Sequence, residues 1–255
     1  MESKYNSGVK KKNDDKKSNL GFEYEDKIIK ILKEKKIIPK NKKRTGGSDK
    51  ADLVVNYGGN KIITELKNKD QGADYGQKEL IWSSDKLWSW SLGKNNMEDA
   101  TVKLFKGLKI IENYIDKDFE PRRYSKKKSM KAKKKSIYED VTVEDYKYDL
   151  KHMEKPNIPI PLDTLFKYYA IKNCFYIQIE KSGFYHLQED KFKLGTKQFD
   201  GKISLRLRAK YRGSRKNIPK KPWDYGLLAK ISLTKKPTPS QFDIEELDGR
   251  EFPFV

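Results

Sequence analysis

The segment from residue 49 to residue 67 constrains the fold most, because it combines a hairpin pattern with charges in an apolar setting. Two glycines at 58–59 separate two apolar runs, and they predict a two-residue hairpin turn, since glycine readily adopts the positive φ angles that such turns need. Side chains alternate between the two faces of a strand, so Glu65 and Lys67 share one face. Pairing across the hairpin then brings Asp52 close to Glu65.

Two carboxylates and an ammonium therefore converge in an otherwise apolar segment. An unpaired buried charge costs several kcal/mol or shifts its pKa instead, so this cluster needs a compensating partner. A hard divalent cation held by Asp52 and Glu65, with Lys67 beside it, accounts for all three charges. The other interpretation is an edge hairpin whose glutamate and lysine are solvated.

The charge of the chain indicates a polyanionic partner. Lys and Arg number 57 against 37 Asp and Glu, for a net charge of +20, which favours nucleic acid or an anionic membrane surface. No apolar run approaches the roughly 20 residues that span a bilayer, and residues 1–19 lack the apolar core of a secretory signal. The single cysteine, Cys174, excludes an intramolecular disulfide framework and a cysteine-based zinc site. We expect a folded, cytoplasmic protein that does not bind membranes.

The N-terminal region predicts a tail and a helix. Residues 1–19 are polar and lysine-rich, which predicts a disordered basic tail that either solubilises the chain or contacts DNA. Residues 20–36 predict a helix whose apolar stripe consists of Phe22, Ile28, Ile29 and Leu32. Glu25 lies three and four positions before two of these residues, so it shares the stripe. It either makes a local salt bridge or reaches the carboxylate cluster.

Together these features resemble the PD-(D/E)xK nuclease superfamily. The resemblance rests on an inward glutamate on the first helix, a strand opening with Ala51-Asp52, a glycine turn and Glu65-Leu66-Lys67 on the next strand. It covers roughly residues 20 to 70, and Ala51 replaces the usual proline. It implies an α/β fold with a mixed β-sheet core flanked by helices, and Mg²⁺-dependent hydrolysis of phosphodiesters, for which Mn²⁺ can substitute.

The resemblance also implies roles for individual residues. Asp52, Glu65 and the backbone carbonyl of Leu66 would ligate Mg²⁺, and Lys67 would position the attacking water or stabilise developing negative charge. Glu25 would hold a metal-bound water or a second metal. Gln77 resembles an auxiliary polar residue on a helix after the motif, pointing back at the site.

Three basic stretches outside the motif are candidate DNA contacts. Residues 40–50 form a basic loop leading into Asp52, and residues 121–136 hold nine basic residues and no acidic ones. The second stretch predicts a mobile loop that wraps DNA, or else a merely solvated charge run. Residues 199–211 predict a strand with a basic face. The candidate DNA-binding residues are Lys42, Lys43, Arg44, Arg122, Arg123, Lys126, Lys127, Lys128, Arg206, Arg208, Lys210, Arg212 and Arg215.

Other segments predict the scaffold. Residues 96–115 predict one amphipathic helix, with Met97, Thr101, Leu104, Phe105, Leu108, Ile111 and Ile115 on its apolar face. Prolines at 156, 159 and 161 predict a connection without regular structure, and residues 174–187 predict a hairpin. Three tryptophans, at 82, 88 and 90, are candidate core or interface residues, or alternatively stack on an unpaired base.

We therefore predict a single nuclease domain over residues 20–255, with a catalytic core (20–120), a basic loop (121–136) and a β-rich DNA-recognition half (137–255). The expected activity is that of a Mg²⁺-dependent Type II restriction endonuclease acting on double-stranded DNA. Cutting both strands of a palindrome needs two active sites, so we expect a homodimer, and restriction-modification implies a cognate DNA methyltransferase. The alternatives are a structure-selective nuclease of the resolvase, repair or nicking type, and a non-catalytic nucleic-acid-binding protein on a nuclease scaffold.

Overall fold

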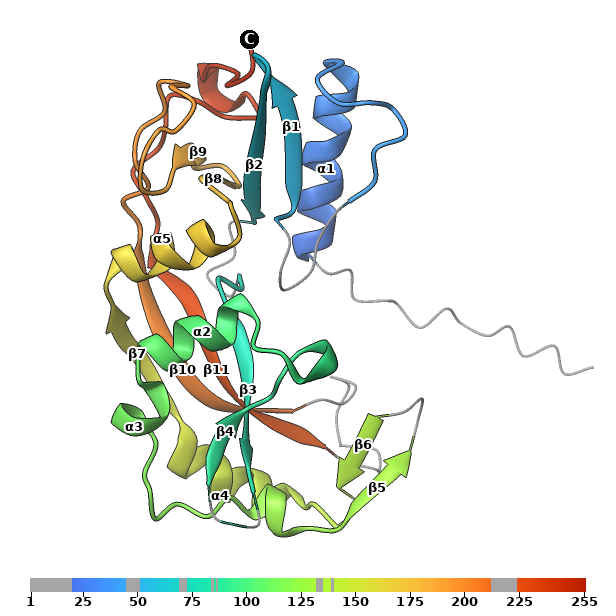
Figure 1. Ribbon diagram of the computed structural model, residues 1–255, viewed down its shortest axis with the longest axis vertical. Coiled ribbons are helices and arrows are strands. Elements are labelled where there is room, and N and C mark those ends of the chain that lie inside the picture. Colours follow the sequence, from blue (N-terminus) through green and yellow to red (C-terminus); the bar gives the residue numbers. More distant parts are fainter. Residues whose placement is uncertain are drawn as a thin grey trace, which may run out of the picture.

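The fold is mixed α/β with helices flanking the strands, as expected, and it is built on two main sheets. The computed structural model describes residues 20–44, 51–68, 73–83, 85, 87–131, 135–138, 140–211 and 224–255. Its strand orders are β1-β2-β8-β9 in a four-stranded sheet, β4-β3-β11-β10-β7 in a five-stranded sheet, and β5-β6 in a separate hairpin. Figure 1 shows the four-stranded sheet and α1 at one end of the molecule, the five-stranded sheet at the other, and α5 between them.

The predicted hairpin is confirmed. Strands β1 (Leu53–Tyr57) and β2 (Asn60–Lys67) pair antiparallel, with Leu53 opposite Thr64. Gly58 and Gly59 have φ angles of 54° and 74°, the left-handed conformation that a type I′ turn requires. Side chains along a strand alternate between the two faces of the sheet. The pairing register therefore also determines which side chains face α1 and which face the charged cluster.

Helix α1 (Leu20–Glu34) covers one face of this sheet. Its buried residues are Tyr24, Ile28, Ile29 and Leu32, which pack on Leu53, Val55 and Ile62 of the hairpin. Phe22 was expected in the apolar stripe, but 49% of it is exposed. The helix ends two residues earlier than predicted, before Lys36 adopts a left-handed φ of 59°.

Strand β8 makes the four-stranded sheet mixed. Helix α5 (Leu162–Ile171) leads into β8 (Tyr176–Ile179), which pairs parallel to β2 with Glu65 opposite Ile177. β8 then turns back into β9 (Gly183–His186), which confirms the predicted hairpin. The parallel pairing brings the C-terminal end of α5 beside the charged end of β2, although more than 100 residues separate them in sequence.

The five-stranded sheet forms the larger core. Along β10 the residues Ile203, Leu205, Leu207 and Ala209 are buried, while Arg206 and Lys210 are exposed, which confirms the predicted alternation. Its strands are β3 (Gln77–Trp82), β4 (Trp88–Trp90), β7 (Lys155–Ile160), β10 (Lys202–Tyr211) and β11 (Tyr225–Lys235). Of the three tryptophans, Trp90 is buried against Phe105, with ring centroids 5.1 Å apart, as expected for a core residue.

The proline-rich segment at 156–161 was predicted to lack regular structure, and this prediction is wrong. Pro156 and Pro159 lie within β7. Among the strands that the structure describes, β7 is at the edge of its sheet and pairs only with β10, so one side of its backbone needs no ladder hydrogen bonds. Proline, which has no N–H to donate, is tolerated at such edges.

The single helix predicted over 96–115 is broken. The structure has a 3₁₀ turn η1 (Lys94–Asn96), then α2 (Ala100–Gly107) and α3 (Ile110–Tyr114). Asp99 caps α2 by accepting a hydrogen bond from the backbone N–H of Val102 at 3.0 Å. Lys109 adopts a left-handed φ of 50° between the two helices. Met97 therefore precedes the helix and is 67% exposed.

The basic stretch at 121–136 is also ordered differently from the mobile loop predicted. It contains the 3₁₀ turn η2 (Arg122–Ser125) and most of a hairpin formed by β5 (Lys128–Lys131) and β6 (Lys135–Tyr138). Helix α4 (Val143–Met153) follows, capped by reciprocal hydrogen bonds between Thr142 and Asp145.

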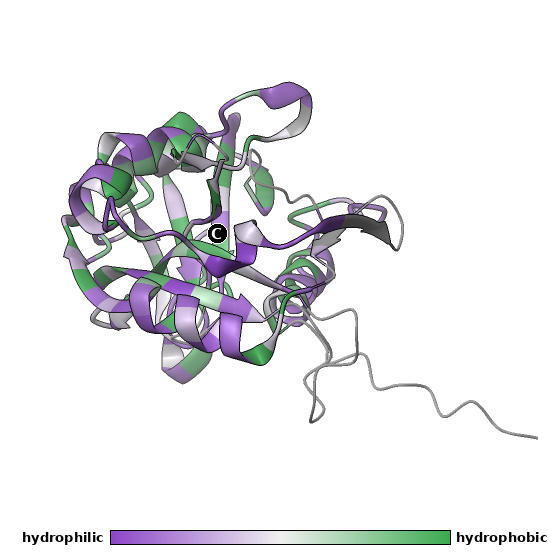
Figure 2. Ribbon diagram, turned by 90° about the horizontal axis from the view of Figure 1, so that it is seen from below, coloured by the Kyte–Doolittle hydropathy of each residue, from purple (hydrophilic) through white to green (hydrophobic). Residues whose placement is uncertain are grey.

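In Figure 2 the helices carry hydrophilic and hydrophobic residues on different sides. None of the helices that the structure describes has the length and apolar character needed to cross a bilayer.

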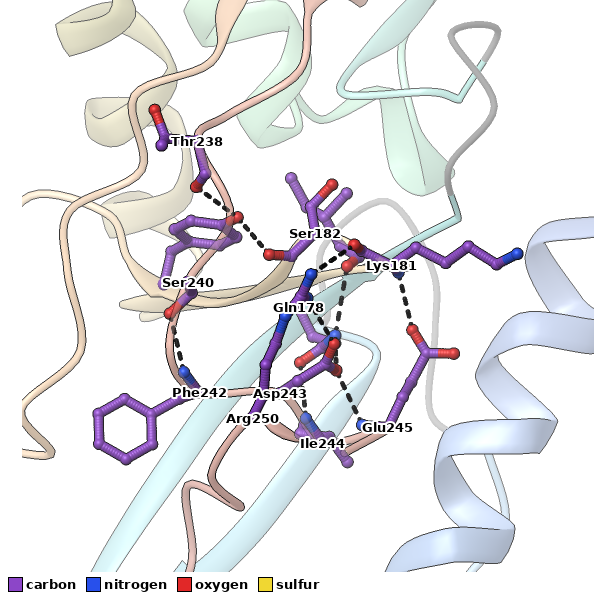
Figure 3. Close-up of polar contacts among 12 residues, drawn as sticks. Gln178, Lys181, Ser182, Thr238, Ser240, Phe242, Asp243, Ile244, Glu245 and Arg250 are labelled. Carbon is purple, nitrogen blue, oxygen red and sulfur yellow. Dashed lines mark hydrogen bonds and ion pairs between the residues drawn. The ribbon is translucent and has the colours of Figure 1, made fainter. Parts of the chain in front are cut away.

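The C-terminal segment packs on the four-stranded sheet and includes the 3₁₀ turn η3 (Leu247–Gly249). The fully buried carboxylate of Asp243 accepts hydrogen bonds from Gln178 Nε2, the Glu245 backbone N–H and Arg250 Nη1, each at 2.8 Å (Figure 3). The amide oxygen of Gln178 accepts in turn from the backbone N–H of Ile244. This network ties the C-terminal segment to β8 and thereby stabilises the sheet that carries the charged hairpin.

Candidate active site

Asp52, Glu65 and Lys67 meet at the open end of the β1–β2 hairpin. Asp52 directly precedes β1, and the pairing of Leu53 with Thr64 places it opposite Glu65. Its Oδ2 accepts a hydrogen bond from the backbone N–H of Leu66 at 3.0 Å. Lys67 Nζ lies 2.6 Å from Glu65 Oε1 and 4.0 Å from Asp52 Oδ2. The structure thus brings together the three residues of the sequence motif.

A fourth charged residue, Lys172, was not anticipated from sequence. Its Nζ lies 3.2 Å from Glu65 Oε2, so the two oxygens of this buried carboxylate bind two different lysines. Lys172 is the residue that ends α5, and its side chain is only 5% exposed. In a chain with so many lysines, the only available signal was its place just before the strand that pairs with β2.

Glu25 is the third carboxylate near this site. Burial and the negative charge of Asp52 raise its pKa to about 7, so the two carboxylates influence each other. Burial and the charge of Glu65 likewise raise the pKa of Asp52 to about 6. Arg44 Nε lies 4.0 Å from Glu25 Oε2 and 3.6 Å from Asp26 Oδ1. Glu25 therefore both approaches the cluster and makes a local ion pair.

Glu65 and Lys67 are held in their charged forms. Burial disfavours ionisation of Glu65, but the ammonium groups of Lys67 and Lys172 outweigh burial and lower its pKa. Burial also disfavours the charge of Lys67, yet Glu65 and Asp52 raise the pKa of its ammonium above the usual value. Lys67 is consequently a cation over the whole neutral pH range and has little capacity to act as a base.

A groove of about 890 Å³ runs from Asp52 between α1 and the segment at 40–44. Phe22 lies at its wall, about half exposed, with the Arg44 guanidinium 4.2 Å from its ring centroid. The cations that line the groove are Lys30, Lys33, Lys42, Lys43 and Arg44, and the carboxylates are Glu25, Asp26 and Asp52. A polyanion in this groove would therefore lie beside the carboxylate cluster.

The donor atoms at this site suit a hard divalent cation. Asp52, Glu65 and Glu25 offer only carboxylate oxygens, the ligands that Mg²⁺ prefers. Burial, and after it the charge of a neighbouring carboxylate, raises the pKa values of Glu25 and Asp52, so a cation would stabilise both in their ionised forms. Across the described residues no three acidic, histidine or cysteine side chains yet meet in a metal-holding arrangement. Glu65 would have to exchange a lysine ammonium for the cation, since both its oxygens are engaged.

The predicted DNA contacts in strand β10 and in residues 121–136 differ in their exposure and in their ion pairs. Arg123, a predicted DNA contact, is 3% exposed, pairs with Asp224 and lies 3.7 Å from Glu79, so its side chain is buried in ion pairs within the protein. Arg206 is half exposed and its Nε donates to Glu154 at 2.6 Å. Four of the predicted contacts are exposed: Arg122, Lys127, Lys128 and Lys210. Lys126 pairs with Asp145 at 3.4 Å. Arg208 is half buried, and its Nε has no partner among the described residues. Arg212 and Arg215 lie outside the described residues.

Gln77 also differs from expectation. It lies at the start of strand β3, not on a helix, and is paired with Lys230 of β11. The segment after the motif is a strand because residues 77–82 pair antiparallel with β11. The side chain that does approach the motif from this region belongs to Tyr75, whose ring centroid is 5.9 Å from Lys67 Nζ.

Comparison with known proteins gives one partial similarity. No protein-family model matches the sequence, and no curated protein matches it. The structure is similar to that of HhaI endonuclease in complex with DNA, with a TM-score of 0.39 and 13% sequence identity. The superposition covers 85% of this chain and 92% of that chain. At this TM-score the two folds agree only in part.

Proposed function

We propose that the protein is a Mg²⁺-dependent endonuclease that hydrolyses phosphodiester bonds of double-stranded DNA. The observation that carries the proposal is the convergence of Asp52, Glu65 and Lys67 at one end of a hairpin, beside a groove lined by five cations. The groove suits a phosphate backbone, and the carboxylates suit the cation that phosphodiester hydrolysis uses. The carboxylates and the cation-lined groove lie side by side, and this combination supports the proposal.

The proposed roles follow from charge and position. Asp52 and Glu65, with the Leu66 carbonyl, would hold the cation, which lowers the pKa of a water and offsets charge on the phosphate when bound. Lys67 acts as a fixed positive charge toward the phosphate in the transition state, because its neighbours keep it protonated. Glu25, with a pKa of about 7, is matched to accept a proton from the attacking water at neutral pH.

The groove provides the path for the strand that is cut. Lys30 and Lys33 lie on successive turns of α1, and Lys42 to Arg44 lie on the opposite wall. Neutralising phosphates with these cations releases counterions from DNA, so binding here depends strongly on salt. Lys30 and Lys33 therefore join the DNA-binding residues that sequence alone indicated.

The finer proposal is a Type II restriction endonuclease. Arg206, Arg208 and Lys210 lie on one strand of the second sheet, and Arg208 has an Nε without a partner in the described structure. Arginine reads guanine bidentately in the major groove, which makes this strand the candidate for sequence recognition. Cleavage of both strands then calls for a homodimer, and protection of the host genome calls for a cognate methyltransferase.

Incubation of the protein with long duplex DNA and Mg²⁺, or Mn²⁺ in parallel, tests this proposal. Discrete fragments are the result expected of a restriction endonuclease. A smear would indicate a nuclease that cuts without sequence specificity. Intact DNA, together with retained DNA binding, would show a non-catalytic binding protein and contradict the proposal.

A further inference from the structure

Glu65 is bound on both oxygens by lysines from two distant parts of the chain. Lys67 lies two residues away on the same strand and contacts Oε1 at 2.6 Å, while Lys172 at the end of α5 contacts Oε2 at 3.2 Å. Both side chains of the second pair are buried, with exposures of 5% and 6%. Lys67 also approaches Asp52, whereas Glu65 is the one carboxylate that Lys172 pairs with in the described part of the chain.

We infer that Lys172 is a positioning residue for Glu65. The Lys172 ammonium occupies a Glu65 carboxylate oxygen that the divalent cation needs, and it leaves that oxygen when the cation binds. The inference rests on the proposed function, because it assumes that Glu65 binds a divalent cation. It adds a residue that the sequence motif does not contain, and it assigns that residue to the metal-free state.

The charges around the cluster support this role. Two carboxylates, Asp52 and Glu65, face two ammonium groups, Lys67 and Lys172, so these four groups together carry no net formal charge without a metal. A buried carboxylate that lost one of its partners would be costly, which explains why a second lysine is present. A divalent cation adds two positive charges to this balanced site and therefore competes directly with an ammonium.

The location of Lys172 makes it suited to hold Glu65 in place. Its backbone N–H donates to the Tyr169 carbonyl at 3.0 Å, so the main chain is fixed at the end of α5. Its Nζ lies 5.5 Å and 5.3 Å from the ring centroids of Tyr168 and Tyr169. These aromatic faces give the ammonium a favourable environment that does not depend on Glu65. Lys172 can therefore release the carboxylate without becoming an unpartnered buried cation.

Calorimetric titration of Mn²⁺ into the full chain tests the inference without an activity assay. Lys172→Met keeps an unbranched side chain that is one atom shorter and removes the charge, and Lys172→Gln is a second, polar replacement. Both should bind Mn²⁺ about tenfold more tightly than the wild type, the size of a typical coupling between competing ligands. Lys172→Arg, which keeps the charge, should stay close to the wild type. Affinities in Met and Gln variants that equal the wild type or fall below it would overturn the inference.

A matched control lies on the same helix. Lys167 is 72% exposed and pairs only with Asp163 within the described residues, so Lys167→Met should leave Mn²⁺ affinity unchanged. A second measurement needs no destabilising variant: the ¹⁵Nζ resonance of Lys172 in the wild type, assigned from the Lys172→Arg spectrum, should shift when Mg²⁺ saturates the site. A resonance unmoved by saturating Mg²⁺ would also overturn the inference.

The two proposals fail in different ways. If the wild type binds Mn²⁺ and cuts DNA while Lys172→Met binds Mn²⁺ no better, only the role of Lys172 is wrong. If the wild type neither binds Mn²⁺ nor cuts DNA, the proposed function is wrong and the role of Lys172 with it.

Discussion

The carboxylate of Asp52 accepts a hydrogen bond from the backbone N–H of Leu66, 3.0 Å away across the open end of the β1–β2 hairpin. Leu66 stands between Glu65 and Lys67, so this bond fixes Asp52 relative to both. A slip of one residue in the β1–β2 register would turn these side chains to the other face and disperse the cluster. The chemistry of the site therefore depends on a turn of two glycines about seven residues away along each strand.

The stabilising effect of Mg²⁺ should depend on pH. The pKa values of Glu25 (about 7) and Asp52 (about 6) are raised in the folded protein, so protonation favours the folded state. Their contribution to the free energy of unfolding is fully present below the unfolded pKa, near pH 4, and is lost as pH rises to about 7. Mg²⁺ binds the deprotonated carboxylates, so it should raise the unfolding temperature above about pH 7 and have little effect near pH 5.

Thermal unfolding with and without Mg²⁺ across this range measures the effect, and Glu25→Gln is its control. Without metal this variant should match the wild type near pH 4 and exceed it at about pH 8, by about 1 kcal/mol after allowing for the water that reaches Glu25. A Mg²⁺ effect of equal size at both pH values would contradict the involvement of these carboxylates.

The groove beside α1 should account for part of the salt dependence of DNA binding. Replacing both Lys30 and Lys33 with glutamine removes two cations, so the slope of log K against log salt should fall by about 2. The slope is measured from affinities at several salt concentrations on one duplex. The double replacement of the exposed Lys103 and Lys117, which lie outside the groove, is the matched control. Equal slopes for the two double variants would place the DNA elsewhere.

Arg123 should contribute to stability and not to DNA binding. Arg123→Met removes the buried guanidinium that pairs with Asp224 and lies near Glu79, and it should lower the free energy of unfolding by about 3 kcal/mol. Chemical denaturation measures this loss. Arg122→Met, one residue earlier, removes an exposed guanidinium that lies 3.8 Å from the Tyr148 ring centroid and should cost under about 1 kcal/mol. A larger loss at Arg122 than at Arg123 would reverse this assignment.

The hairpin and its charges could be predicted from sequence because their signals are local. Gly58-Gly59 determines the turn, the turn determines the register, and the register brings Asp52 to Glu65. The alternation of buried and exposed residues along β10 could also be predicted, because the apolar residues Ile203, Leu205 and Leu207 stand at every second position.

The features that sequence missed depend on contacts between distant segments. Lys172 reaches Glu65 only because β8 pairs parallel to β2, a pairing that no local pattern encodes. In sequence, Arg123 cannot be distinguished from the basic residues around it. Its burial depends on its ion pair with Asp224, which directly precedes β11. The break between α2 and α3 arises from a left-handed conformation at Lys109, which its residue type does not indicate.

The central claim is that the charged hairpin hydrolyses DNA, and the most direct test compares Asp52→Asn with Asp26→Asn on one duplex substrate with Mg²⁺. Asp52→Asn keeps an oxygen that can accept from the Leu66 N–H while removing the charge, and Asp26 lines the same groove next to Glu25 with its side chain two-thirds exposed. We predict that Asp52→Asn binds the duplex but cuts it at least about a thousandfold more slowly, a typical effect of losing a key transition-state contact. Asp26→Asn should cut at close to the wild-type rate. Cleavage by Asp52→Asn at the wild-type rate would contradict the account.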